Sequence, residues 1–191
     1  MYELNEKVKN LEPYSPISGT YRIRLDANES CFDAPADFRA ALAEQLATAA
    51  FNRYPDPSAG ALCEAFAAYY GIDARYVTAG NGSDELISII MNAFLMRGER
   101  MMTLAPDFSM YRFYASLAEA DCVVFPKGEA LTVDVDAVIE SCRKEQIRLL
   151  VFSNPCNPTS LGLRREAVRR LIRSVDALVV LDEAYMDFWD Q

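Results

Sequence analysis

Asp182 and Tyr185 are the residues whose type and position most strongly suggest chemistry. They follow residues 177–181, a short apolar run without polar alternation, which is typical of a strand buried on both faces of a parallel sheet. Open α/β sheets bind ligands at the carboxyl ends of their strands, so we expect the Asp182 carboxylate to point toward a ligand. The alternative is that Asp182 caps the next turn and that Tyr185 packs on the surface.

Asn157 lies in a second segment of interest, residues 151–158, where an apolar strand breaks into two Asn-Pro pairs. Each proline fixes its own φ and biases the preceding asparagine toward an extended conformation. The loop is therefore stiff, which suits a side chain that must be held in one place. An ordinary rigid turn would contain the same dipeptides.

Residues 80–85, Gly-Asn-Gly-Ser-Asp-Glu, join a short apolar segment to an amphipathic helix that begins near Ser83. A helix start offers unpaired N–H groups and the positive end of the helix dipole, and glycines let the main chain approach an anion closely. The segment therefore suits a phosphate. A hairpin turn at Asn81-Gly82 is disfavoured, because an apolar helical pattern follows instead of a second strand.

The elements that must position these residues alternate between strand and helix. Strands are predicted over 76–79, 101–104, 122–125, 147–153 and 177–181, and helices over 35–50, 58–70, 83–94, 134–144 and 164–174, with a further helix containing Phe108 and Tyr111. Ser58 is the expected cap of the second helix, and an acid begins the helix at Asp134. This alternation predicts an α/β fold with a doubly wound, largely parallel sheet and a site along its carboxyl edge.

The composition limits the classes of function. The chain has 191 residues, 51% hydrophobic residues and a net charge of −9, which fits a globular domain and argues against a nucleic-acid or anionic-membrane surface. Without histidine, His-based triads are excluded, and the five cysteines lack metal-ligand spacing, so we expect mostly buried free thiols and no metal site. A signal core and a membrane-spanning run are both missing from the sequence, so a cytoplasmic location is expected.

Six segments of the chain resemble, in order and approximate spacing, the fold-type I pyridoxal-phosphate-dependent aminotransferases, and within them the histidinol-phosphate aminotransferase branch. The six segments are Asp26–Glu29, Arg53–Pro57, Gly80–Glu85, Pro106–Tyr111, Asn154–Thr159 and Asp182–Tyr185. No single segment is decisive, but six in one order are much more specific than a lone motif. The resemblance covers nearly the whole chain and implies pyridoxal 5'-phosphate as the cofactor.

The resemblance implies how the cofactor ring is held. Asp182 would pair with the pyridinium nitrogen, while Asn157 and Tyr185 would hydrogen-bond the phenolic oxygen. Phe108 would stack on the ring, although packing in the core is its alternative. The sequence departs from the family pattern at two of these places. Position 108 is often tyrosine in the family, and Ser160 stands where the family has glycine, so an altered turn is expected there.

The remaining assignments concern the phosphate and the substrate. The resemblance places Tyr54 at the cofactor phosphate of the partner subunit, and its alternative is a proline-braced surface turn. Asn28 would lie near the substrate, and Tyr14 would lie there too unless it belongs to a loosely attached terminus. The cofactor-phosphate cup would be formed by Gly82, Ser83 and Asp84.

The implied reaction is transfer of an amino group from an amino-acid-like donor, with histidinol phosphate as the first guess, to a 2-oxo acid such as 2-oxoglutarate. A homodimer is expected. The family places its Schiff-base lysine beyond Gln191, and the carboxyl-terminal small domain is also absent from this sequence. We therefore expect an inactive amino-terminal piece, with an arm over residues 1–30 and a partial cofactor-binding large domain over 31–191. Apolar surface left uncovered would promote oligomerisation.

Two alternatives to this function stay open. One is another class I or II aminotransferase, or an amino-acid-phosphate decarboxylase of similar fold. The other is a noncatalytic module that binds pyridoxal phosphate or dimerises. Cofactor affinity without an imine absorbance would indicate the noncatalytic module.

Overall fold

The computed structural model describes residues 2–9, 11 and 17–189 and divides the chain into two compact units. The first unit comprises Met1–Leu11 together with Gly80–Gln191, and the second comprises Glu12–Ala79. The first contains the sheet and most of the buried side chains.

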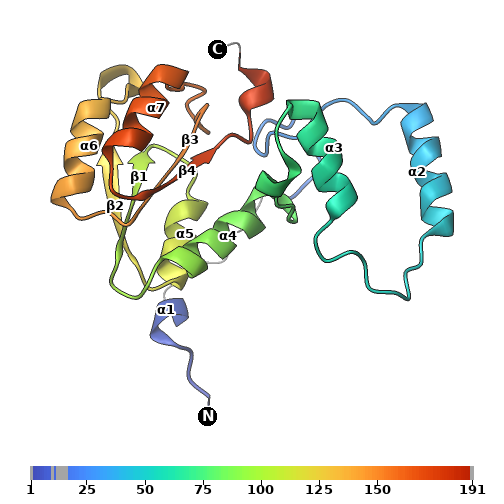
Figure 1. Ribbon diagram of the computed structural model, residues 1–191, viewed down its shortest axis with the longest axis horizontal. Helices are drawn as coiled ribbons and strands as arrows, with labels where there is room; N and C mark the ends of the chain where they lie inside the picture. Colours follow the sequence, from blue (N-terminus) through green and yellow to red (C-terminus); the bar gives the residue numbers. More distant parts are fainter. Residues whose placement is uncertain (1, 10, 12–16, 190–191) are drawn as a thin grey trace. The chain divides into compact units, whose positions relative to one another are not determined.

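The first unit is built on a four-stranded sheet in the order β2-β1-β3-β4 (Figure 1). Its strands are β1 (Arg100–Ala105), β2 (Asp121–Pro126), β3 (Leu149–Ser153) and β4 (Leu178–Asp182), and all three pairings are parallel. The predicted doubly wound parallel sheet is therefore confirmed. The chain reverses its direction of travel across the sheet between the neighbours β1 and β3, which is the position where such sheets place their ligands.

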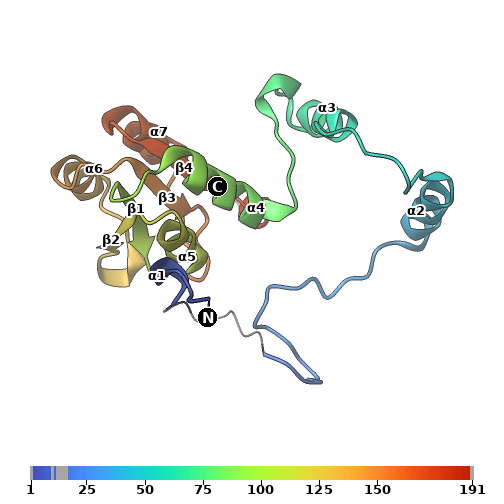
Figure 2. The same ribbon diagram turned by 90° about the horizontal axis from the view of Figure 1, so that it is seen from below.

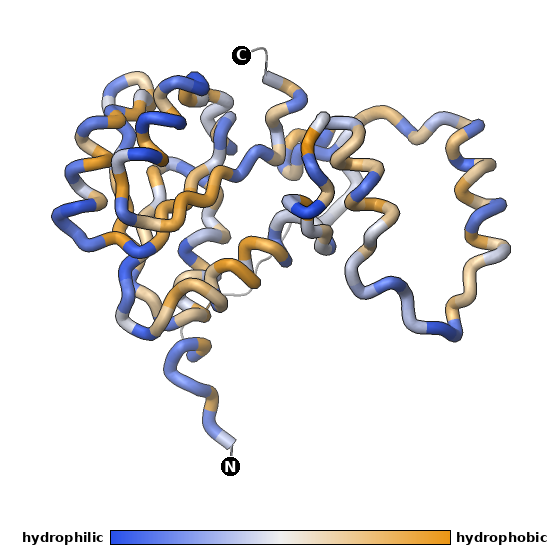
Figure 3. The backbone as a smooth tube through the Cα atoms, in the orientation of Figure 1, coloured by the Kyte–Doolittle hydropathy of each residue, from blue (hydrophilic) through white to orange (hydrophobic). Residues whose placement is uncertain are grey.

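Helices α4 (Gly82–Phe94) and α5 (Met110–Leu117) cover one face of this sheet, and α6 (Val135–Lys144) and α7 (Arg165–Ser174) cover the other. Successive strand residues point to opposite faces, so both faces need apolar residues. Met101 packs with α4 and α5, whereas its neighbour Met102 packs with α6 and α7. This is why the strands follow hydrophobic stretches of sequence without alternation (Figure 3).

Two polar contacts help to fix the helices of this unit. Asp134 accepts hydrogen bonds from the N–H groups of Asp136 and Ala137 at 3.0 and 3.1 Å, which confirms the predicted acid cap of α6. The short helix α1 (Glu6–Lys9) lies beside α5 (Figure 2), where the Lys7 ammonium donates to the carbonyl oxygen of Leu117 at 3.2 Å.

The second unit contains α2 (Ala36–Thr48), α3 (Gly60–Tyr70) and the 3₁₀ helix η1 (Ala74–Tyr76). The predicted cap at Ser58 is wrong, because the Asp56 carboxylate accepts from the N–H groups of Gly60 at 2.7 Å and Ser58 at 2.9 Å. The predicted strand at 76–79 is also wrong. Val77 is extended, but no strand of the described structure pairs with this segment, so the extended residues form no ladder.

The cysteines are free thiols, as predicted: Cys63, Cys142 and Cys156 are buried, Cys122 is half-buried and Cys31 is exposed. Burial raises the pKa of Cys142 to about 11, so this thiol stays protonated at neutral pH. Within the described ranges, no group of three or more Cys, Asp or Glu side chains is arranged to hold a metal ion. None of the helices described has the length and apolar content needed to cross a membrane.

Truncating Leu171 should destabilise the first unit strongly, because this side chain is 0% exposed between α7 and the sheet. We expect Leu171→Ala to lower the free energy of unfolding by about 2–5 kcal/mol. Ile172→Ala, on the same helix but with 47% of the residue exposed, is the matched control and should change it by less than about 1 kcal/mol. Urea unfolding followed by circular dichroism measures both, and equal losses would contradict this packing.

Candidate functional site

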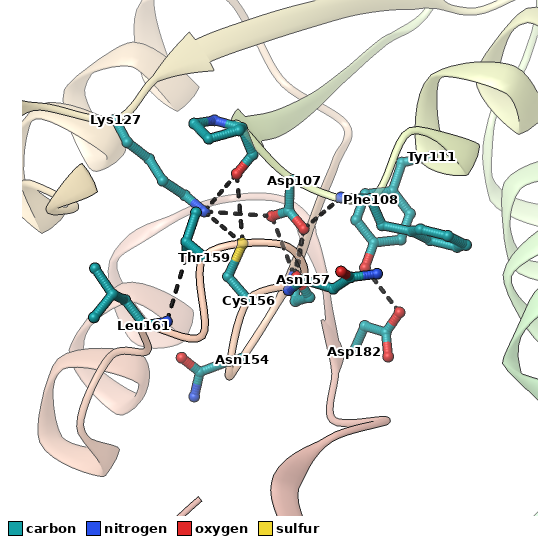
Figure 4. Close-up of polar contacts among 12 residues, drawn as sticks. Asp107, Phe108, Tyr111, Lys127, Asn154, Cys156, Asn157, Thr159, Leu161 and Asp182 are labelled. Atoms are coloured by element: carbon teal, nitrogen blue, oxygen red, sulfur yellow. Dashed lines mark hydrogen bonds and ion pairs between the residues drawn. The ribbon is translucent and has the colours of Figure 1, made fainter. Parts of the chain in front are cut away.

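Three predicted site residues of the first unit lie where β1, β3 and β4 end. Phe108 follows β1, Asn157 follows β3 and Asp182 is the last residue of β4. The register pairs Ser153 of β3 with Asp182, and the N–H of Asn154 donates to the Asp182 carbonyl at 2.8 Å. The carboxyl edge at the β1–β3 reversal therefore brings these three segments together (Figure 4).

Asp182 is oriented by two neutral donors. The Tyr111 hydroxyl donates to Oδ2 at 2.8 Å, and the N–H of Ala184 donates to Oδ1 at 3.1 Å. The second bond means that Asp182 does brace the following turn, as the alternative interpretation expected. A carboxylate oxygen can accept two hydrogen bonds, and each oxygen of Asp182 accepts one of the two bonds described above. Asp182 therefore still has acceptor capacity for a ligand.

Tyr111 is a site residue that sequence reasoning assigned only to a helix. Its side chain is fully buried on α5, yet its hydroxyl reaches a carboxylate 71 residues away. Burial raises the pKa of Tyr111 well above its usual value, and the charge of Asp182 raises it further. Tyr111 is therefore a neutral hydrogen-bond donor. Its sequence signals were its place in the Pro106–Tyr111 segment and its polar atom on an otherwise apolar helix face.

Phe108 lies two residues before α5 begins, so it is outside the helix in which it was predicted. Its ring is half-buried and packs edge-to-face on Tyr111, with ring centroids 5.5 Å apart and planes at 83°. Its N–H donates to Oδ1 of Asp107 at 2.8 Å. Phe108 thus partly fills its alternative role in the core while its main chain is fixed at the strand end.

Asn157 is fixed by a hydrogen bond to its main chain and by hydrogen bonds across its loop. Its N–H donates to Oγ of Ser153 at 3.1 Å. Across the loop, Asn154 accepts from the N–H of Leu163 at 2.6 Å and donates to the Leu163 carbonyl at 3.2 Å. These bonds agree with the predicted stiffness. Asn157 itself is half-buried.

In the turn after Thr159, Ser160 stands in place of the glycine of the family pattern, and an altered turn there stays a prediction. Ser160 takes a left-handed conformation with φ of 60°, which favours the glycine found there in the family pattern. Gly162 meets a different constraint, because a Cβ at this position would lie 2.5 Å from the Trp189 ring. Glycine at 162 therefore allows Trp189 to pack against the loop.

A buried charged cluster beside the site was not predicted. Asp107 and Lys127 have side chains only 2% and 4% exposed, and the Lys127 ammonium lies 4.0 Å from Oδ2 of Asp107. The Ser153 hydroxyl donates to Oδ1 of Asp107. The available signal was that Asp107 and Lys127 each follow the end of a strand. Their meeting depends on β1 and β2 being neighbours.

The predicted phosphate cup lies at the start of α4 in the same unit. Gly82 begins the helix with φ of 80°, a left-handed conformation that suits glycine. In the described structure no side chain caps this helix start, and Glu85 instead accepts from the N–H of Asn81 at 2.6 Å. The first-turn N–H groups at Ser83 and Asp84 thus belong to a helix end suited to an anion.

Four predicted residues remain, and they are Tyr185, Asn28, Tyr54 and Tyr14. Tyr185 is half-buried at the start of the 3₁₀ helix η3 (Met186–Phe188), three residues after Asp182. Asn28, with φ of 54°, and the fully exposed Tyr54 belong to the second unit. Tyr14 lies outside the described residues. The roles of these four residues remain predictions.

Sequence comparison relates the chain to known enzymes. A family model for aminotransferases of class I and II matches residues 21–191. The histidinol-phosphate aminotransferase of Clostridium novyi (strain NT) is 40% identical over 182 residues, covering 95% of this chain and 51% of that protein. That of Thermococcus gammatolerans is 38% identical over 97% of this chain and 53% of that protein. The chain spans about half the length of the curated relatives it matches.

Solved structures share the fold. Histidinol-phosphate aminotransferase from Sinorhizobium meliloti, solved with pyridoxal-5'-phosphate, matches with a TM-score of 0.78 and 23% identity over 84% of this chain and 44% of that chain. L-threonine-O-3-phosphate decarboxylase from Porphyromonas gingivalis matches with a TM-score of 0.66 and 25% identity over 81% of this chain and 44% of that chain.

Replacing Tyr111 with phenylalanine should reduce the loss of stability in alkali. A phenol with an ordinary pKa of 10.0 ionises in the unfolded chain, whereas folded Tyr111 keeps its proton to higher pH. The stability that depends on this difference is complete below pH 10.0 and is lost as the pH rises above it. Between pH 8 and about 11, the urea midpoint should therefore fall less in Tyr111→Phe than in the unmodified chain. Equal falls would show that the hydroxyl is not buried.

Proposed function

The chain belongs to the aminotransferase class I and II family, and we propose that it supplies the cofactor-binding part of a pyridoxal-phosphate-dependent aminotransferase. The observation that carries this proposal is the position of Asp182. It ends β4 at the carboxyl edge beside the β1–β3 reversal, keeps acceptor capacity on both oxygens and shares this edge with Phe108 and Asn157.

The chemistry of these residues fits pyridoxal 5'-phosphate. A carboxylate matches the protonated ring nitrogen, and an amide matches the phenolic oxygen. The half-buried aromatic ring of Phe108 suits the cofactor ring, and the start of α4 at Gly82, Ser83 and Asp84, which no described side chain caps, suits the phosphate. Asp182, Asn157, Phe108 and Tyr185 would hold the ring.

Each residue has a distinct task in this proposal. The bound cofactor supplies an electron sink for negative charge at the substrate α-carbon. Asp182, as a carboxylate, keeps the proton on the ring nitrogen, and Tyr111 holds Asp182 in orientation. Asn157 and Tyr185 would hydrogen-bond the phenolic oxygen, and Phe108 would stack on the ring and help to exclude water.

The proposed reaction is amino-group transfer from histidinol phosphate to a 2-oxo acid such as 2-oxoglutarate, which the names of the relatives support. We propose a cytoplasmic homodimer in which Tyr54 contacts the cofactor phosphate of the partner subunit. Asn28 and Tyr14 would border the substrate. The proposed organisation is an arm over residues 1–30 and a large-domain part over residues 31–191. The Schiff-base lysine of the family would correspond to a position in the part of the relatives that this chain does not match.

A second candidate is decarboxylation of an amino-acid phosphate. The fold shared with the Porphyromonas gingivalis decarboxylase favours it, because one set of ring-holding residues can serve either reaction. A noncatalytic cofactor-binding module is the remaining alternative.

Pyridoxamine 5'-phosphate should bind this chain reversibly, because the ligand lacks the aldehyde and tests only noncovalent contacts. Asp182→Asn should weaken binding about tenfold or more, since it removes the charge that faces the ring nitrogen. Asp121→Asn, an exposed carboxylate at the other end of a strand, is the matched control and should change little. Isothermal titration calorimetry measures each affinity. No saturable binding by the unmodified chain would contradict the proposed cofactor site.

The reaction can be tested in a complete enzyme that carries this chain. Histidinol phosphate with 2-oxoglutarate should give glutamate, and O-phospho-L-threonine should release no CO₂. Asp182→Asn should leave the fold intact and slow the first half-reaction about a hundredfold or more, because the ring nitrogen loses its anionic partner. CO₂ release would support the decarboxylase instead, and an unchanged half-reaction rate would remove Asp182 from the mechanism.

A further inference from the structure

The cluster of Asp107, Lys127, Ser153 and Cys156 is not used by the proposed cofactor contacts. It joins the ends of three strands, since Asp107 follows β1, Lys127 follows β2 and Ser153 ends β3. Both charged side chains are at least nine-tenths buried, at 2% and 4% exposed. Burying charge costs free energy unless partners compensate, so a cluster of this kind needs an explanation.

A chain of hydrogen bonds runs from this cluster to two ring-holding residues (Figure 4). Asp107 Oδ1 accepts from the N–H of Phe108 at 2.8 Å and from the Ser153 hydroxyl. Oγ of Ser153 in turn accepts from the N–H of Asn157 at 3.1 Å. Phe108 is therefore one bond from Asp107, and Asn157 is one bond from Ser153.

Lys127 lies beside the Asp107 carboxylate. Its ammonium lies 4.0 Å from Oδ2 of Asp107, donates to the Pro106 carbonyl at 2.8 Å and lies 2.9 Å from Sγ of Cys156. Burial raises the pKa of Asp107, whereas the Ser153 hydroxyl, the Phe108 N–H and the Lys127 charge each act to lower it. Burial has the largest effect and the pKa of Asp107 is raised overall, so these donors offset only part of the cost of burying its charge.

We propose that Asp107 and Ser153 are positioning residues, which fix the main chain at Phe108 and Asn157 and thereby aim the two side chains that hold the cofactor ring. This inference rests on the function proposed above. Its competitor is a purely structural cluster that ties three strand ends together. The two differ in one respect: a positioning effect of Ser153 must act through Asn157.

The test compares Ser153→Ala with Ser153→Thr, which keeps a hydroxyl. We expect Ser153→Ala to weaken pyridoxamine 5'-phosphate binding about tenfold and Ser153→Thr to restore most of it. In an Asn157→Ala background, adding Ser153→Ala should cost less than about twofold more, because the side chain that it positions is already gone. Equal losses in both backgrounds would overturn the proposal and leave a structural cluster.

A second measurement needs no cofactor. Hydrogen exchange of the Asn157 amide in the ligand-free chain should be about tenfold faster in Ser153→Ala and near normal in Ser153→Thr. Ser174→Ala, at the exposed end of α7, is the control and should leave this amide unchanged. Unchanged exchange in Ser153→Ala overturns the positioning role. Failure of the unmodified chain to bind the ligand instead overturns the proposed cofactor site, so the two failures are distinguishable.

Discussion

The parallel direction of all four strands is the constraint on which the rest of this structure depends. Parallel strands end at one edge, and helices must cover both faces of the sheet, so interior strand positions are mostly apolar, with the buried Thr103 of β1 an exception. Polar side chains are then tolerated at the strand ends, where the inter-strand hydrogen bonding stops. Asp107, Lys127, Ser153, Asn157 and Asp182 all lie at or just beyond a strand end for this reason.

The carboxylates of Asp107 and Asp182 at this edge have different charged and neutral neighbours. Asp107 has a buried ammonium, Lys127, within 4.0 Å and uses its oxygens on nearby donors. The hydrogen-bond donors of Asp182 are neutral, a phenol and a main-chain amide. Under the proposed function, a carboxylate whose described hydrogen-bond donors are neutral suits a protonated ring nitrogen. Asp107 therefore suits structure and positioning, and Asp182 suits the ligand.

Sequence patterns were sufficient where the controlling interactions are local or periodic. Apolar runs located β1 to β4, and the acid before α6 identified its cap, because burial and capping act over a few residues. The pattern failed at 76–79, since an extended segment becomes a strand only when another strand pairs with it. The Tyr111–Asp182 bond spans 71 residues and the Ser153–Asp107 bond spans 46, so neither could be read before the strand order was known.

The second unit buries few of its apolar side chains. Helix α2 buries no residue, and its Phe38, Leu42 and Leu46 are 59%, 48% and 49% exposed along one side. A helix gains most of its stability from tertiary packing of its apolar side chains, and the described structure packs these three only in part. Tyr54 belongs to this unit and is fully exposed. Its proposed contact with a partner subunit would cover a side chain that this unit leaves exposed.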